Sequence, residues 1–223
     1  HCVYAGGDDV LAFVPVYVAL KKARELSEAF TRVFHEARAQ HDLDFVSAPT
    51  FSVGIAVVHH LSPLRDCLTA ARAAEKIAKD DAGRNAWALR ILKRGGAPLT
   101  LHGKWTGDTD GELVDLSAHS AGGGAIPRGL AYALRDASVR LGAAHGEPSP
   151  ATAVELCELE RILEQKKVSR SNAAASTDGE ERPVEHPTDA ATLIRGLAKR
   201  MDLQTVADWL VAARTLSGMG ESA

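Results

Sequence analysis

The sequence has few cysteines and no long apolar run, and each shortage excludes a class of protein. Its 223 residues include only three cysteines, Cys2, Cys67 and Cys157, without a Cys-x-x-Cys pair. This pattern supports neither a zinc knuckle nor a disulfide framework, and free thiols are expected in a reducing cytosol. No apolar run approaches the roughly 20 residues of a membrane helix, and no signal peptide is visible. We therefore expect a cytoplasmic protein with no membrane partner.

The chain also lacks a strong excess of charge of either sign. It carries 26 Lys and Arg against 29 Asp and Glu, a formal net charge of -3. No global basic field attracts nucleic acid, although RNA contacts made within a larger assembly stay open. With 45% hydrophobic residues, the composition is that of a globular chain long enough for one or two cores.

The first residues predict a hairpin. The apolar runs HCVYA and VLAFVPV flank Gly6, Gly7, Asp8 and Asp9. Gly-Gly and Gly-Asp between two such runs indicate a tight turn, because hairpin turns need positive φ. We expect this hairpin to be buried. Since His1 already lies inside the strand pattern, we interpret the chain as a piece of a longer polypeptide.

Helical and strand patterns alternate as far as residue 94. Residues 17–40 place apolar side chains at helical spacing, and residues 51–60 suit a buried strand. Pro63 opens the next helix and Gly83 caps it, and residues 85–94 form a further strand. This order predicts an α+β fold with a sheet on one side and helices on the other. One more strand and helix in front would complete the split βαβ, ferredoxin-like plan, so we expect an N-terminally incomplete fold.

The pattern changes after residue 95 to one dominated by helices. Residues 95–105 suit a short strand or loop, and helices are expected around 112–119, 126–144, 149–167, 190–201 and 203–217. Ser149 is the candidate cap of the third of these helices. Residues 168–189 are polar and predict a flexible loop. We therefore expect an α/β domain over residues 1–96 and a small α-helical domain over residues 97–223.

The Gly-Gly-Asp-Asp turn has two chemical interpretations. Two adjacent carboxylates can hold a divalent cation, because Mg²⁺ prefers oxygen ligands. The glycines would let a nucleotide approach the backbone. A solvated hairpin turn favours the same residues, so the motif alone leaves both interpretations open.

A second motif follows at a plausible distance. Ser52, Gly54 and Ala56 in the strand, Ala74-Glu75 and Ala78-Lys79 in the helix, and Gly83-Arg84-Asn85 in the turn resemble the second half of the GGDEF, or palm, nucleotide-cyclase domain. With GGDD in place of GGDEF, residues 1–94 look like the large palm-domain subunit of type III CRISPR effector complexes, in its type III-B (Cmr) version. Residues beyond 94 are similar to the helical domain of that subunit.

The resemblance implies a nucleotidyltransferase, a cyclic oligoadenylate synthase that joins ATP 3′–5′ and releases pyrophosphate. Asp8 and Asp9 would be the catalytic residues and the ligands of two Mg²⁺ or Mn²⁺ ions. Gly6 and Gly7 would lie against the nucleotide, and Lys79 and Arg84 would contact its phosphates. The implied partners are the other subunits of the complex, guide RNA and target RNA.

Other residues have structural interpretations. Lys79 and Arg84 also suit a helix end and a solvated turn, and Lys76 is an alternative phosphate contact. His59 and His60 would point to opposite faces of a regular strand, which excludes one shared metal. The basic residues of 17–40, including Arg24, suit a solvated helix face. Trp87, Trp105 and Trp209 suit core or interface positions.

Two further functions stay open from the sequence. One is a catalytically silent palm that acts as a scaffold in the same complex. The other is a diguanylate cyclase, although Asp9 and Val10 stand where that family has Glu and Phe.

Overall fold

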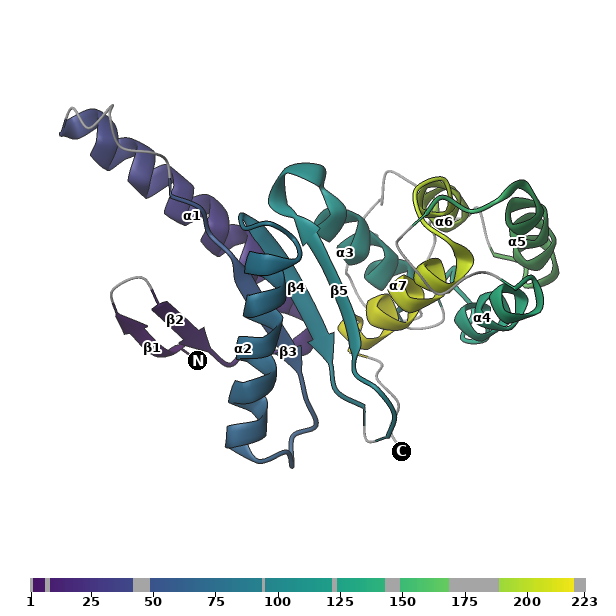
Figure 1. Cartoon of the computed structure of the whole chain (residues 1–223), viewed down its shortest axis with the longest axis horizontal. Helices are drawn as coiled ribbons and strands as arrows, with labels where there is room; N and C mark the ends of the chain where they lie inside the picture. The colour runs from purple at the N-terminus through teal and green to yellow at the C-terminus, as the bar shows by residue number, and fades with distance from the viewer. Residues whose placement is uncertain are drawn as a thin grey trace, which may run out of the picture. The chain divides into compact units, whose positions relative to one another are not determined.

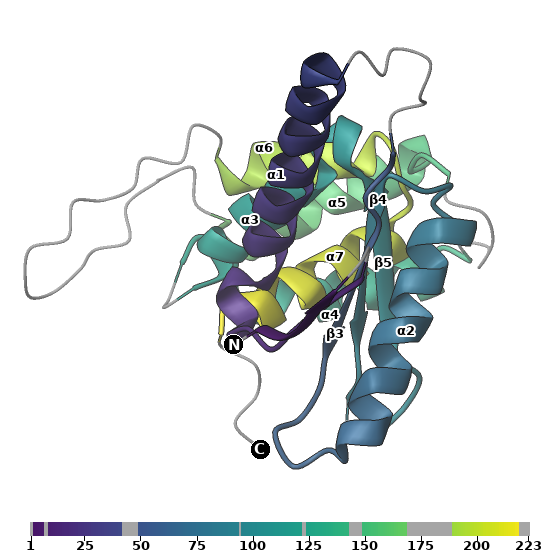
Figure 2. The same ribbon diagram turned by 90° about the vertical axis from the view of Figure 1, so that its left-hand side faces the viewer.

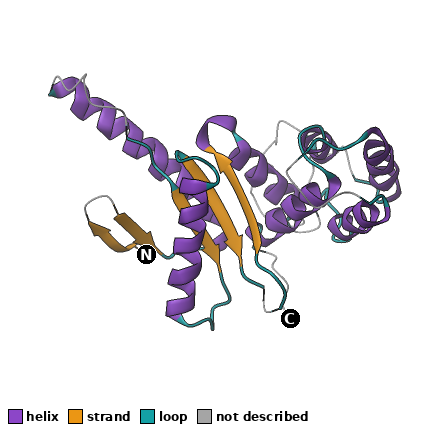
Figure 3. Ribbon diagram, viewed as in Figure 1, coloured by secondary structure: helices purple, strands orange, loops and turns teal. Residues whose placement is uncertain are grey.

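The computed structural model describes residues 2–6, 9–41, 49–93, 95–121, 124–142, 149–168 and 189–218. The chain divides into two compact units, residues 1–111 and 112–223. Figure 1 gives the order of the elements, and Figure 3 separates helices from strands. The first unit holds all described strands, and helices make up most of the described part of the second.

The strands of the first unit form two separate sheets. β1 (Cys2–Gly6) and β2 (Asp9–Ala12) make the antiparallel hairpin that the sequence predicts. β3 (Val53–Val57), β4 (Ala86–Ile91) and β5 (Leu99–Lys104) make a three-stranded sheet in that order. β3 is parallel to β4, and β5 is antiparallel to it. Because β5 pairs with β4, the first unit extends beyond residue 96.

Two helices lie on opposite sides of the three-stranded sheet. They are α1 (Ala19–Gln40), preceded by the 3₁₀ turn η1 (Val16–Val18), and α2 (Leu64–Asp80). Figure 2, turned by 90° from Figure 1, shows the sheet between them. The expectation of helices on one side only is therefore wrong. Helices on both faces require strands that are apolar throughout, and five of the six residues of β4 are buried.

The contact between α2 and the sheet is made by small side chains. Ala74 and Ala78 of α2 pack against Ala86 and Ala88 of β4, and all four are fully buried. A Cβ built on Gly54 of β3 would lie 2.2 Å from the backbone nitrogen of Glu75 and 2.5 Å from the carbonyl oxygen of Ala71. Glycine is therefore needed here because the helix backbone passes directly over the strand.

The hairpin is more exposed than its apolar sequence predicts. Most described residues of β1 and β2 are exposed, including Val3 (56%), Tyr4 (55%) and Val10 (49%). The expectation of a buried hairpin is therefore wrong for these residues. Leu11 is half-buried, and the other apolar side chains of the hairpin are exposed in the described part of the chain.

The second unit is built from helices. α3 (Thr109–Ser120) follows the 3₁₀ turn η2 (Trp105–Gly107) and runs from the first unit into the second. The other helices are α4 (Leu130–Arg140), α5 (Ala153–Gln165), α6 (Ala190–Ala198) and α7 (Leu203–Leu216). Their core is formed by apolar side chains that include Leu116, Leu130, Leu134, Leu159, Ile194 and Val206.

The cap of α5 differs from the expected one. Thr152, not Ser149, precedes the helix: its hydroxyl accepts from the backbone N–H of Glu155, whose carboxylate accepts from the N–H of Thr152. This reciprocal pair is a capping box. The expected loop at residues 168–189 lies almost wholly outside the described residues. In the described ranges, no helix combines the length and apolar character needed to cross a bilayer.

Candidate functional site

The hairpin brings one glycine and one aspartate of the predicted site together. Gly6 pairs with Asp9 at the end of the ladder, while Gly7 and Asp8 lie outside the described residues. The carboxylate of Asp9 is exposed, and it has no hydrogen bond or ion pair with another described residue. A Cβ on Gly6 would lie 2.7 Å from the hydroxyl of Tyr4. Tyr4 is exposed and its ring can turn aside, so this contact alone does not require glycine at position 6.

Lys79 lies on the last turn of α2 and is engaged in an ion pair. Its ammonium is 2.5 Å from Oε1 of Glu75, one helical turn earlier, and both side chains are part-exposed. An exposed i,i+4 pair contributes only about 0.3–0.5 kcal/mol. Lys79 can therefore exchange Glu75 for a phosphate at little cost.

Arg84 lies in an unusual turn between α2 and β4. Gly83, Arg84 and Asn85 have φ values of 71°, 60° and 47°, so three successive residues are left-handed. The expected glycine at the end of the helix is confirmed at Gly83, and the N–H of Arg84 donates to the carbonyl of Ala78 at 3.1 Å. The guanidinium of Arg84 has no partner among the described residues, and an Arg without a partner can bind a phosphate.

The described site residues therefore fall into two groups, Gly6 with Asp9 and Lys79 with Arg84. No hydrogen bond or ion pair joins the two groups in the part of the chain that is described. No cluster of three or more His, Cys, Asp or Glu side chains that could hold a metal is found among these residues. Of the predicted site residues, the described part of the chain thus contains one carboxylate, Asp9, and two cations at the end of α2, Lys79 and Arg84.

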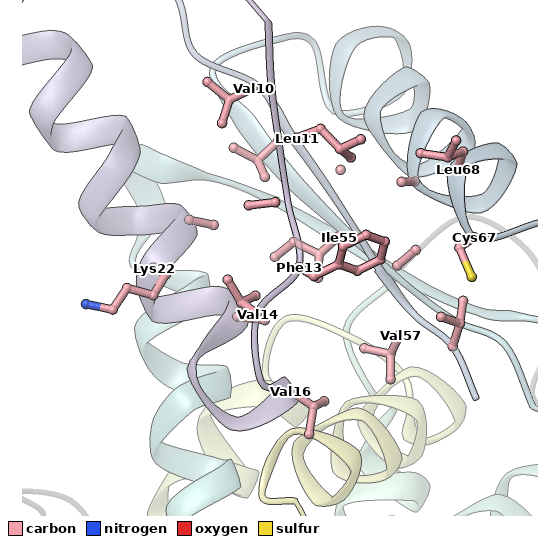
Figure 4. Close-up of a pocket in the computed structure, with 18 of the residues that line it drawn as sticks. Val10, Leu11, Phe13, Val14, Val16, Lys22, Ile55, Val57, Cys67 and Leu68 are labelled. Atoms are coloured by element: carbon pink, nitrogen blue, oxygen red, sulfur yellow. The ribbon is translucent and has the colours of Figure 1, made fainter. Parts of the chain in front are cut away.

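A groove of about 660 Å³ separates the two sheets of the first unit. It is lined by β2 and the segment that follows it, by β3 and the loop after it, and by one side of α1 and of α2. Figure 4 shows Val10, Phe13 and Val14 around the groove with Ile55 and Val57 of β3. The strand that borders the groove, β2 in one sheet and β3 in the other, is an edge strand of its sheet. Each of these strands therefore has an edge without a partner strand in the described residues.

The two adjacent histidines lie beyond the strand on which they were expected. β3 ends at Val57, and the rings of His59 and His60 are 4.3 Å apart between centroids. They therefore lie side by side rather than on opposite faces. Nδ1 of His59 accepts from the N–H of Leu61 at 3.2 Å. This contact supports a structural role for His59 at the end of the groove.

One charged cluster was missed from the sequence. Arg24 of α1, whose side chain is 24% exposed, binds both carboxylate oxygens of Asp110, which is 4% exposed. It also donates to the carbonyl of Trp105 at 2.8 Å and lies 5.4 Å from the centre of that indole ring. The hydrogen bond with Asp110 raises the pKa of Arg24 above its ordinary value. The expectation of a solvated Arg24 is therefore wrong.

The tryptophans are core residues, as the sequence indicates. Trp87 is 0% exposed, Trp105 6% and Trp209 4%. The indole N–H of Trp105 donates to the carbonyl of Phe51 at 2.9 Å. With the pair of Arg24 and Asp110, this contact joins α1, the start of α3 and the segment before β3.

Comparison with known proteins identifies the class of this first unit. Residues 1–88 match the family model described as Cas10/Cmr2, second palm domain. The match contains the hairpin, α1, β3, α2 and the turn at Arg84, so the similarity to a palm domain covers these elements.

The relative is a subunit of a CRISPR system. The chain is 36% identical over 96 residues to the CRISPR system Cmr subunit Cmr2 of Pyrococcus furiosus, and the match covers 43% of this chain. This part of the chain is therefore related to the Cas10/Cmr2 subunits of type III-B CRISPR systems. The match spans 10% of the length of that relative. No solved structure matches the chain.

Proposed function

We propose that this chain carries the palm of a cyclic oligoadenylate synthase in a type III-B CRISPR effector complex. The reaction joins ATP units through 3′–5′ bonds and releases pyrophosphate. The observation that supports this most directly is the hairpin, in which the exposed Asp9 faces Gly6 within a chain segment that matches a palm family. Asp9 is exposed and has no partner among the described residues, so its carboxylate is available to a ligand.

The residues of the hairpin suit a divalent metal. Asp9 offers oxygen donors, the type that Mg²⁺ and Mn²⁺ prefer, and Asp8 beside it would double the negative charge. We propose that Asp8 and Asp9 hold two such ions. Bound ions would polarise the α-phosphate and neutralise charge on the departing pyrophosphate.

The chain's own cations would orient the substrate. Lys79 would release Glu75 and bind a phosphate oxygen as a point charge, and Arg84 would bind phosphate through its planar fork. Gly6 and Gly7 would allow the ribose to approach the backbone of the turn. Positioning and neutralisation of charge account for most catalysis of phosphoryl transfer.

We also propose the partners of the chain. The similarity to Cmr2 supports assembly with other subunits of a type III complex, together with guide and target RNA, in the cytoplasm. The second unit offers no catalytic cluster among its described residues. We propose that it packs against a helical subunit of the complex, and deletion of residues 112–223, which keeps Asp110 in the first unit, should then impair co-purification of that subunit.

The groove supports the full ferredoxin-like form of the palm. It lies between two free strand edges and between α1 and α2, so a strand within it would pair on both sides and be covered on both faces. We propose that one continuously apolar strand from elsewhere in the full-length protein occupies it and joins the two sheets into one.

Amide hydrogen exchange tests this strand. Residues 9–12 and 53–57 should exchange at least tenfold more slowly in the full-length protein than in residues 1–223 alone, because added ladder hydrogen bonds protect edge amides. Equal exchange rates in the two proteins would contradict a strand in this groove.

The proposed activity is tested in the intact complex with ATP, target RNA and Mg²⁺ or Mn²⁺. Asp8→Ala with Asp9→Ala should abolish synthesis of cyclic oligoadenylate while the complex still assembles. Glu28→Ala with Glu36→Ala removes the same charge from α1 and should leave synthesis unchanged. Synthesis at the normal rate by the Asp8/Asp9 variant would refute the assignment.

The two alternatives give different products. A diguanylate cyclase would consume GTP in place of ATP. A scaffold palm would make no cyclic product with either nucleotide, even with target RNA bound.

A further inference from the structure

Lys104, at the end of β5, makes an unusual set of contacts with the turn that carries Arg84. Its ammonium donates to the carbonyl of Gly83 at 2.6 Å and to the carbonyl of Arg84 at 2.7 Å. The next residue, Trp105, donates its N–H to the carbonyl of Asn85 at 3.3 Å. Three successive carbonyls of the turn are therefore bound by two successive residues of one strand end.

This turn needs such support. Arg84 and Asn85 have φ values of 60° and 47°, and L-residues other than glycine adopt this region only at a cost in free energy. The left-handed conformation directs the carbonyls of Gly83 and Arg84 to one point, and the ammonium of Lys104 occupies that point. A Cβ on Gly83 would lie 3.3 Å from the same ammonium, so the fit is close.

We propose that Lys104 is a positioning residue, whose ammonium holds residues 83–85 in the left-handed turn and so fixes the direction of Arg84 toward the nucleotide phosphates. The proposal rests on the proposed function for its second half only. Lys104 lies beyond residues 1–88, which the family model covers. It acts through backbone carbonyls and not through its own contact with substrate.

The first half of the proposal, that Lys104 holds the turn, is tested without an activity assay. In the full-length protein, Lys104→Met should increase the exchange rate of the Arg84 amide, which donates to Ala78, by roughly tenfold, because hydrogen bonds from a charged donor are the stronger ones. Lys93→Met removes an exposed lysine near the other end of the hairpin formed by β4 and β5 and should leave that rate unchanged. Unchanged exchange in Lys104→Met would overturn the proposal.

The second half is tested by nucleotide affinity in the intact complex. Lys104→Met should raise the KM for ATP by roughly tenfold with little change in kcat, since a misdirected Arg84 weakens binding of the phosphates. In an Arg84→Met background the same substitution should have no further effect, because Lys104 acts through Arg84.

The outcomes of these experiments distinguish the positioning role of Lys104 from the proposed function of the chain. Equal effects of Lys104→Met with and without Arg84 would mean that Lys104 contacts the substrate itself, and would overturn the positioning role. If the wild-type complex binds no ATP, that role falls together with the proposed function. The exchange result still decides whether Lys104 holds the turn.

Discussion

Substitution of Gly54 by alanine tests how closely α2 lies on the sheet. The added Cβ would meet three backbone atoms of α2 at 2.2, 2.5 and 2.7 Å, whereas ordinary contact begins near 3.4 Å. Backbone atoms within a helix cannot rotate away as the end of a side chain can. The helix would therefore have to move outward by more than an ångström, which would separate Ala74 and Ala78 from β4.

The expected cost is at the upper end of the range for overpacking, about 3 kcal/mol. For a unit of this size, such a loss corresponds to a fall in Tm of roughly 10 °C or more. Urea unfolding followed by tryptophan fluorescence measures it. A Trp209→Phe background restricts the signal to Trp87 and Trp105, which are both in the first unit.

Matched controls come from glycines that have space around them. Among the described residues, a Cβ on Gly95 or on Gly196 would meet no atom within 4 Å beyond its chain neighbours and, for Gly196, its own helix backbone. Gly95→Ala should change stability by less than about 0.5 kcal/mol, and Gly196→Ala, inside α6, should stabilise its unit by about 0.5–1 kcal/mol. A Gly54→Ala protein as stable as the wild type would refute the close approach of α2 to β3.

Three further predictions concern the ion pair, the helix cap and the pH dependence. Arg24→Met should lower the stability of the first unit by about 2–3 kcal/mol in urea unfolding, because the buried Asp110 loses its partner. Thr152→Ala should destabilise the second unit by about 1 kcal/mol through loss of the capping box, whereas Ser149→Ala should have no effect. The hydrogen bond from Arg195 lowers the pKa of Glu160 below its ordinary value of 4.5. The ionised Glu160 therefore contributes its full stabilisation above pH 4.5, and this contribution is lost as pH falls through the lowered pKa. Glu160→Gln should therefore be less stable than the wild type at pH 7, and urea titrations should show the difference disappear in acid.

The elements that the sequence predicts well are those set by local pattern. The antiparallel pairing of β1 with β2 follows from the apolar runs on either side of a turn sequence. α2 begins directly after Pro63, where the missing N–H costs nothing. Gly83 is left-handed as expected of a residue beyond a helix end. The cap of α5 was also readable, because Thr152 followed three residues later by Glu155 is the signature of a capping box.

The features that were missed depend on residues far apart in the chain. Arg24 and Asp110 are separated by 86 positions, and no local pattern distinguishes a paired arginine from a solvated one. The position of helices on both faces of the sheet likewise depends on tertiary packing. Of the candidate site, the sequence located the hairpin and the turn at Arg84, but the pairing of Lys79 with Glu75 and the contacts of Lys104 required coordinates.

The edge of β3 that has no partner strand in the described part of the chain has a consequence at high protein concentration. An unpaired row of N–H and C=O groups beside apolar side chains is a template on which a second molecule can form a strand. Residues 1–223 prepared alone should accordingly self-associate through Val53–Val57. The degree of self-association in solution then indicates whether another strand is paired with that edge.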